Sequence, residues 1–137
     1  MKAIGIALAT AFLAVTSASA ASPVTGHWLT AEKDAVILIA PCGSQLCGSI
    51  DRFLVPPPQG LDQRDINNLD PAKRSRKLLG MAILTGFTHD GGVWRGTIYD
   101  PKSGKTYRSV LERDGGKLKV KGCISVFCQT QTWLPAR

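Results

Sequence analysis

Apolar and polar residues alternate along most of the chain beyond residue 23, in short runs separated by turn-forming residues. Alternation with a period of two places one side of each run against a core and the other in solvent, which is typical of β-strands. Gly, Pro, Asn and Asp between the runs favour tight reversals of the chain. The pattern predicts strands at residues 24–30, 35–40, 46–55, 78–87, 93–99, 105–113, 117–122 and 129–134.

One segment interrupts this pattern. Residues 56–60 read Pro-Pro-Pro-Gln-Gly, and proline donates no hydrogen bond to a sheet. From there to residue 77 the chain is polar and charged. Asp70 followed by Pro71 favours one or two helical turns over residues 70–77, with Asp70 as the N-cap. A long loop or short helix is therefore expected between the third and fourth strands.

The other connections are short, so consecutive strands are expected to pair. We expect an all-β fold, an antiparallel up-and-down meander of about eight strands. Closing the meander into a small barrel would remove its exposed edges. An open, curled sheet is the alternative.

The first 20 residues have a different character. Lys2 precedes an apolar run of about 13 residues, and Ala18-Ser19-Ala20 forms an A-x-A cleavage motif. The run is shorter than the roughly 20 residues needed to span a bilayer core. We predict a signal peptide at residues 1–20, cleaved after Ala20, and a single periplasmic or secreted domain at residues 21–137 with no transmembrane segment. A retained membrane anchor is the alternative.

The four cysteines form two C-x4-C pairs, each around an expected reversal. Facing residues at a reversal have the Cα separation of about 5.5 Å that a disulfide requires. The spacing alone would also allow a zinc site, but export to an oxidising compartment favours disulfides. We predict the disulfides Cys42–Cys47 and Cys123–Cys128, and neither a metal nor another cofactor.

The chain has a formal net charge of +7. A basic balance often indicates nucleic-acid binding, but export argues against that partner. Charge is concentrated in Lys73, Arg74, Arg76 and Lys77. Such a run is usually a solvated surface; the functional interpretation is attraction to anionic envelope surfaces such as lipid head groups or acidic polysaccharide.

Candidate catalytic residues are few. His27 and His89 lie beside a tryptophan and in a turn, positions more typical of packing or surface residues than of acid–base catalysts. Asp62, Asp65 and Asp70 cluster on the long loop and could perform glycoside chemistry only if held about 5 to 10 Å apart. Turn and capping roles are more typical of such residues. No catalytic residue is predicted, and a hydrolase is the least favoured function.

Aromatic residues are the other candidates for a functional site. If they point inward, a small barrel acquires an aromatic cavity of the kind that holds one small apolar ligand. Plain core packing is the alternative. The residues expected to line such a cavity are Trp28, Trp94, Tyr99, Tyr107 and Trp133.

Several ordered motifs resemble the bacterial domain of unknown function 2147. They are Gly26-His27-Trp28, Leu46-Cys47-Gly48, Leu78-Leu79-Gly80, Trp94-Arg95-Gly96, the run from Ile98 to Tyr107, Leu118 to Gly122, and Thr132-Trp133. The resemblance spans nearly all of residues 21–137. It implies an exported envelope protein, mainly of Gram-negative bacteria, with no assigned activity.

A second resemblance concerns the fold. Gly26-x-Trp28 on the first strand and a basic residue after the last strand are similar to the calycin signature of lipocalins and fatty-acid-binding proteins. In that signature an arginine packs over the tryptophan and closes the barrel bottom, which here implies Arg137 over Trp28.

Together these features predict an exported, non-enzymatic envelope protein that binds a small apolar or amphipathic ligand. The alternative is a protein- or surface-interaction module that acts through residues 73–77. The identity of the ligand and the oligomeric state stay open.

Overall fold

The computed structural model describes residues 2–15 and 23–137. Residues 2–15 form neither helix nor strand, and their side chains are exposed. The expected cleavage motif at residues 18–20 lies outside the described residues. No helix in the described part of the chain is long and apolar enough to cross a bilayer.

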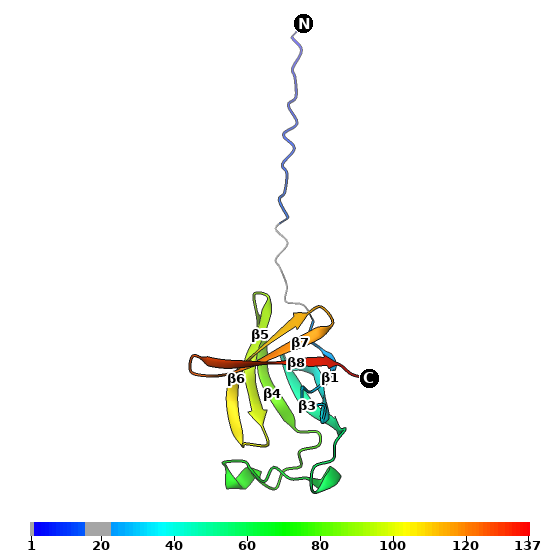
Figure 1. Cartoon of the computed structure of the whole chain (residues 1–137). Coiled ribbons are helices and arrows are strands. Elements are labelled where there is room, and N and C mark those ends of the chain that lie inside the picture. Colours follow the sequence, from blue (N-terminus) through cyan, green and yellow to red (C-terminus); the bar gives the residue numbers. More distant parts are fainter. Residues whose placement is uncertain (1, 16–22) are drawn as a thin grey trace.

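Eight antiparallel strands close into a barrel in the order of the sequence (Figure 1). The last strand closes on the first where Trp28 faces Pro135 and Leu29 faces Leu134. The predicted up-and-down barrel is thereby confirmed, and the open sheet is excluded. The strands are β1 (Gly26–Leu29), β2 (Ala35–Cys42), β3 (Gln45–Phe53), β4 (Ala82–Asp90), β5 (Val93–Asp100), β6 (Lys105–Asp114), β7 (Lys117–Ile124) and β8 (Phe127–Pro135).

The two ends of the barrel are built differently. Because successive strands alternate in direction, the connections β1–β2, β3–β4, β5–β6 and β7–β8 share one end, which we call the mouth end. The connections β2–β3, β4–β5 and β6–β7 share the other, the closed end, and each of these is a tight turn of two residues. The mouth end therefore carries the longer and more variable chain segments.

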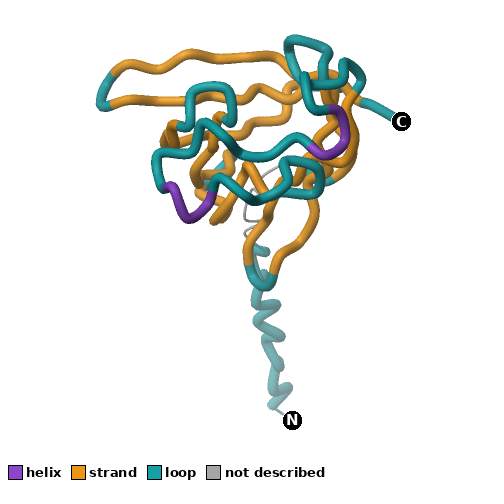
Figure 2. Tube along the Cα trace, turned by 90° about the horizontal axis from the view of Figure 1, so that it is seen from below, coloured by secondary structure: helices purple, strands orange, loops and turns teal. Residues whose placement is uncertain are grey.

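Residues 54–81, which we call the long connection, cross the mouth end between β3 and β4 (Figure 2). They contain two short 3-10 helices, η1 (Gly60–Asp62) and η2 (Pro71–Lys73). The Asp70 side chain caps η2 by accepting a hydrogen bond from the backbone N–H of Ala72 at 3.0 Å. The predicted helical turn and its N-cap are thus present, although the turn is shorter than expected.

Several predicted strand boundaries differ from the structure, and two of the differences have a clear physical reason. Leu78 belongs to the long connection, where its N–H donates to the carbonyl of Gln63, and β4 begins only at residue 82. Pro41 was expected to end the second strand, but β2 continues through it. The β1 strand pairs with β2 only as far as Ile39. Beyond that point β2 is an edge strand, so the N–H that Pro41 lacks would have had no partner in β1.

The closed half of the barrel is filled by side chains. Phe87, Leu111 and Leu118 are fully buried there, and Trp28 is 3% exposed. The Trp28 indole donates to the carbonyl of Val24 at 2.9 Å, which ties the chain entering the barrel to the core.

An arginine lies over the Trp28 ring, as in the calycin signature, but it is Arg113 of β6 and not Arg137. Its guanidinium carbon is 5.4 Å from the ring centroid, and Nη1 donates to the carbonyl of Pro23 at 3.1 Å. Arg113 lies two residues after the buried Leu111 and on the same face of β6. This position in the strand places its side chain next to Trp28. Arg137 lies beyond β8, and its carbonyl accepts a hydrogen bond from Arg52.

Candidate functional site

The mouth half of the barrel contains a cavity of about 1040 Å³. Three of the four connections of the mouth end contribute to its rim, together with Ile124 and Phe127 on either side of the β7–β8 turn, and strands β2 to β8 contribute its wall. Its size is just above the range of roughly 300 to 1,000 Å³ typical of small-molecule pockets. The barrel is therefore packed at one end and hollow at the other.

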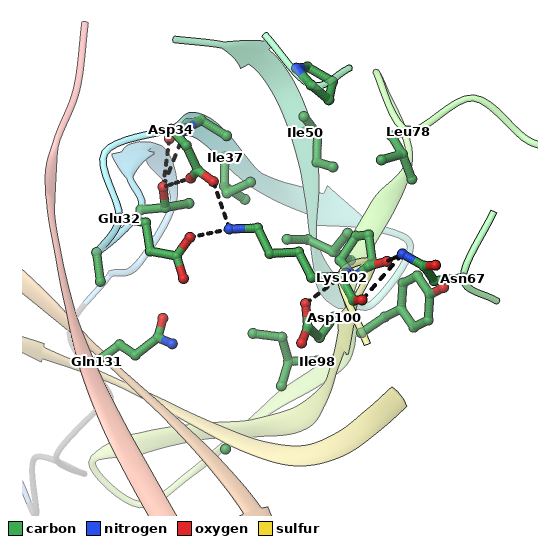
Figure 3. A pocket seen from close by; sticks show the side chains of 18 of the residues that line it. Glu32, Asp34, Ile37, Ile50, Asn67, Leu78, Ile98, Asp100, Lys102 and Gln131 are labelled. Atoms are coloured by element: carbon green, nitrogen blue, oxygen red, sulfur yellow. Dashed lines mark hydrogen bonds and ion pairs between the residues drawn. The ribbon is translucent and has the colours of Figure 1, made fainter. Parts of the chain in front are cut away.

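The deeper wall of this cavity is mainly aliphatic. Branched apolar side chains recur on five strands because alternate residues of each strand face inward. Water gains few hydrogen bonds from such a wall, so an apolar molecule would occupy this space favourably. The aliphatic residues of the deeper wall are Ile37, Ile50, Leu78, Ile83, Ile98 and Val120. Figure 3 labels Ile37, Ile50, Leu78 and Ile98.

Three of the five aromatic residues predicted for the cavity line it. Tyr99, Tyr107 and Trp133 contribute to the wall, and Trp133 is 2% exposed. Trp28 lies in the filled half of the barrel, beneath Arg113. Trp94 also lies toward the closed end, where its ring meets His89 edge-on with centroids 5.6 Å apart. Trp28 and Trp94 therefore do not line this cavity.

Two glutamines on β8 add polarity to the wall and were missed from the sequence. Gln129 and Gln131 both line the cavity, and the side-chain oxygen of Gln131 accepts from the Trp133 indole at 3.2 Å. The signal was available, because Gln129, Gln131 and Trp133 alternate with Thr130 and Thr132. Every second residue of a strand lies on the same face. If Trp133 points inward, Gln131 and Gln129 therefore point inward as well.

A buried carboxylate holds the long connection against the barrel. Asp65 is 1% exposed and accepts from the Tyr99 hydroxyl at 2.5 Å, from Asn68 Nδ2 at 2.8 Å and from Arg76 Nη2 at 3.3 Å. Burial, together with the hydrogen bond to the negatively charged Asp65, raises the pKa of Tyr99 to about 12. Tyr99 therefore stays protonated at neutral pH and can donate permanently to this carboxylate.

The three loop carboxylates do not converge. Asp65 is buried and hydrogen-bonded to Tyr99 of β5 and to the long connection, whereas the Asp62 side chain is 80% exposed and pairs with Lys77 at 3.1 Å. Asp70 caps η2. Each carboxylate thus has a separate structural role, and none of the three lines the cavity.

The predicted basic cluster is also largely engaged within the long connection. Arg76 binds Asp65, Lys77 binds Asp62, and Arg74 Nε donates to the carbonyl of Asn68 at 2.7 Å. In the described part of the chain, Lys73 alone among the four has no side-chain partner. Most of this cluster shapes the loop, and its residual charge remains on the surface of the mouth end.

A second contact fixes the long connection to the β5–β6 turn. Asn67 Nδ2 donates to the carbonyls of Pro101 at 3.1 Å and Lys102 at 3.2 Å. Gly104 has a φ of +72°, and a Cβ there would lie 1.9 Å from the carbonyl oxygen of Asn67. Glycine is required at this position by both conformation and space.

Lys102 reaches across part of the mouth to the β1–β2 turn (Figure 3). Its ammonium donates to Glu32 and, at 3.1 Å, to Asp34. The hydrogen bond to Glu32 raises the pKa of Lys102, against the opposing effect of burial. Burial raises the pKa of Asp34, but hydrogen bonds from Thr30 and Lys102 outweigh it and hold the value below normal. The rim is charged at this side.

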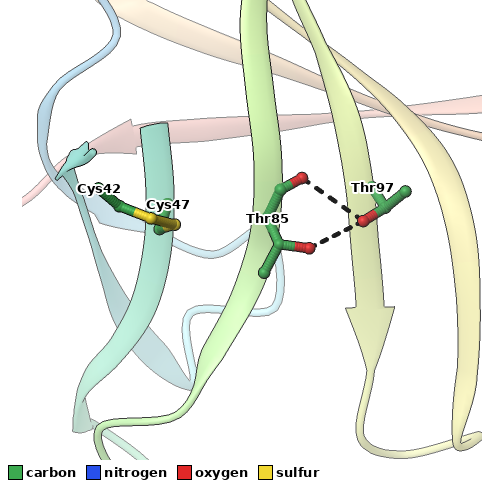
Figure 4. The surroundings of a disulfide bond; sticks show 4 residues. All are labelled: Cys42, Cys47, Thr85 and Thr97. Carbon is green, nitrogen blue, oxygen red and sulfur yellow. Dashed lines mark hydrogen bonds between the residues drawn. A yellow bond between two sulfur atoms is a disulfide. The ribbon is translucent and has the colours of Figure 1, made fainter. Parts of the chain in front are cut away.

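Both predicted disulfides are present, at opposite ends of the barrel. Cys42–Cys47 joins β2 to β3 at the closed end, with a Cα–Cα distance of 5.6 Å (Figure 4). Cys123–Cys128 joins β7 to β8 at the mouth end, and Cys128 lines the cavity. The second disulfide therefore closes the base of a hairpin tip that belongs to the rim.

Comparisons with known proteins give a family and a fold. Residues 26–134 match DUF2147, described as "Uncharacterized protein conserved in bacteria". The structure is similar to that of protein HP1028 from Helicobacter pylori, described as belonging to the lipocalin family, with a TM-score of 0.72. The two chains are 16% identical over 84% of each. No curated protein sequence matches the chain. Both resemblances inferred from the motifs, to the family and to the calycin fold, are confirmed.

Proposed function

The chain belongs to the uncharacterised bacterial family DUF2147, and from this premise we propose that it binds a small apolar or amphipathic ligand in its barrel without catalysing a reaction. The observation that carries the proposal is the aliphatic cavity of about 1040 Å³ in the mouth half of the barrel. Ile37, Ile98 and Val120 would contact an apolar tail, and the cost of leaving this wall in water favours any molecule that covers it.

The polar groups of the wall suit an amphipathic molecule. Gln129 and Gln131 offer amide donors and acceptors at mid-height, and Glu32, Asp34 and Lys102 place charges at the rim. A ligand with its apolar part inside and its polar part toward the mouth would satisfy both regions.

We place this activity outside the cytoplasm, in the periplasm or the surrounding medium. The proposal draws on the apolar run and cleavage motif of residues 1–20, and the two disulfides agree with an oxidising compartment. Removal of residues 1–20 would leave the whole barrel, because β1 begins only at residue 26.

A cavity-filling substitution tests the proposal. Gln129 lines the cavity and faces Gly122 across the β7–β8 ladder, so Gln129→Trp fills space there without removing a described hydrogen bond. We expect it to lower affinity for the apolar fluorescent probe N-phenyl-1-naphthylamine by at least about tenfold, since displaced probe carbons lose about 0.8 kcal/mol per methylene equivalent.

Thr130→Trp is the matched control. Thr130 is exposed on the outer face of the same strand, one residue away, so the same bulky side chain should leave probe affinity unchanged. Thermal unfolding of both variants checks that the barrel is intact. Equal probe affinity in Gln129→Trp and wild type would contradict ligand binding inside the barrel.

A further inference from the structure

Within residues 23–137, exposed apolar side chains lie almost entirely on two segments, the long connection at the mouth end and the tip of the β7–β8 hairpin, which projects to the side of the barrel (Figure 1). Within residues 23–137, nine large apolar residues are exposed, and eight of them lie on the long connection or at the β7–β8 turn. Only Leu134 lies elsewhere, on the barrel wall. The eight are Leu54, Val55, Leu61, Ile66, Leu69, Ile124, Val126 and Phe127.

The most exposed of these residues form the tip of the β7–β8 hairpin. Val126 is 84% exposed and Phe127 is 79% exposed. The Cys123–Cys128 disulfide closes the base of this tip, and Arg108 donates to the carbonyl of Ser125 at its turn. The tip is thus braced, which means that its apolar side chains are held in solvent and do not fold back onto the barrel.

The exposed apolar residues are continuous with the cavity. Val55, Ile66, Ile124 and Phe127 line the cavity while also being exposed. They come from both sides of the mouth, the long connection and the β7–β8 hairpin. An apolar surface therefore runs from the interior of the barrel over its rim.

The long connection is positively charged, whereas the β1–β2 and β5–β6 turns of the rim add Glu32, Lys33, Asp34 and Lys102, which balance each other. The long connection carries five cations, Arg64, Lys73, Arg74, Arg76 and Lys77, against three carboxylates, Asp62, Asp65 and Asp70. Arg108 adds a further cation at the hairpin tip. At the closed end, by contrast, the turns are short and built around Gly43, Gly91 and Gly115, without exposed large apolar side chains.

We propose that the mouth end docks on the surface of an anionic lipid bilayer, with Val126, Phe127 and the apolar residues of the long connection inserted among the lipids. Apolar side chains on separate loop tips, flanked by cations, fit a soft interface with anionic head groups. A protein partner would instead favour one packed apolar core surrounded by a polar rim. The mouth would then face the bilayer, and an amphipathic ligand passes between lipid and cavity. This last step rests on the proposed function; docking itself does not.

Tryptophans introduced at the two ends test the orientation. In Val126→Trp the new indole lies at the hairpin tip, and in the matched control Ser44→Trp it lies on the exposed β2–β3 turn at the closed end. The probe is vesicles of phosphatidylcholine and phosphatidylglycerol in equal parts, with a brominated lipid as quencher. We expect the emission of Val126→Trp to shift to the blue and to be quenched, and that of Ser44→Trp to stay unchanged.

Removal of the apolar tip tests the contribution of insertion. Val126→Ser with Phe127→Ser should lower vesicle affinity about tenfold or more, since burying one such side chain corresponds to about 1.5 to 3 kcal/mol. Binding of wild type should also weaken with salt and on pure phosphatidylcholine, because the cations contribute. All variants carry the same N-terminus, so its contribution cancels in the comparison.

Three outcomes would overturn the docking proposal. They are quenching of Ser44→Trp equal to that of Val126→Trp, vesicle binding unaffected by the serine substitutions, and self-association through the tip in place of vesicle binding, seen by analytical ultracentrifugation. Binding of N-phenyl-1-naphthylamine is measured without vesicles. Failure of docking with intact probe binding therefore leaves the ligand-binding proposal in place.

Discussion

At the scale of single residues, one buried carboxylate accounts for the ordered path of a long, polar, proline-flanked segment. Asp65 gathers donors from β5 and from two positions of the long connection, and its own N–H donates to the carbonyl of Arg76 at 2.9 Å. A buried charge is tolerated only when it is well hydrogen-bonded. The long connection therefore packs against Tyr99 as a unit, and the cavity rim is defined by it.

Truncation of this carboxylate should be costly. Asp65→Ala leaves the Tyr99 hydroxyl and Asn68 without their acceptor, and we expect it to lower the free energy of unfolding by about 2 to 3 kcal/mol. Asp62→Ala is the control, because Asp62 is exposed and its pairing with Lys77 corresponds to less than about 1 kcal/mol. Urea unfolding measures both. Equal losses would show that Asp65 does not anchor the loop.

The same contact should respond to alkaline pH. The hydroxyl of Tyr99 has a pKa raised from 10.0 to about 12, first by burial and then by Asp65. Because the folded value exceeds the unfolded one, the stabilisation is full below about pH 10 and is lost as the pH rises toward 12. We expect the difference in unfolding free energy between wild type and Tyr99→Phe to shrink over this interval. A constant difference would contradict the assignment.

At the scale of elements, the two hairpin disulfides enclose loops of the same length but lie at opposite ends of the barrel. Removing either pair by alanine substitution should lower stability by a similar amount, about 2 kcal/mol from loop entropy. Only removal of Cys123 and Cys128 should weaken probe binding and speed amide exchange at residues 124–127. If loss of Cys42 and Cys47 weakens probe binding equally, the hairpin tip is not part of the site.

Alternation predicted the elements well, because each strand has one face inside and one outside. It failed where that pattern carries no information. Leu78 and Leu79 precede β4 and are apolar because the long connection also packs on the core, so they were assigned to the strand. Apolar runs do not distinguish a strand from a buried connection.

Alternation also gave the face of an aromatic residue but not its height along the barrel. Trp28 and Trp94 belong to the core or pack against it, as expected, yet they lie toward the closed end, whereas Trp133 reaches the cavity. Height depends on the register between strands distant in sequence, as where Leu29 of β1 faces Leu134 of β8. The identity of the arginine over Trp28 depends on the same register, which explains why Arg113 was not foreseen.

At the scale of the whole molecule, the barrel is a container with two unlike ends. Trp28, Arg113 and the cluster around Phe87 fill one half. The other half is hollow, and its rim is apolar, cationic and braced by a disulfide. Hydrophobic surface left uncovered in this way is characteristic of a site that binds something else. The chain enters the barrel at the closed end, so the mouth is not obstructed by Pro23 and the residues that follow it.

Native mass spectrometry of the chain purified from cells that export it tests the central claim most directly. We expect a protein mass corresponding to residues 21–137 together with a small, apolar adduct that is lost on denaturation. In Gln129→Trp the adduct should be reduced, and in Thr130→Trp it should persist. A protein free of any adduct in its native state, or an adduct equally abundant in all three forms, would contradict ligand binding within the barrel.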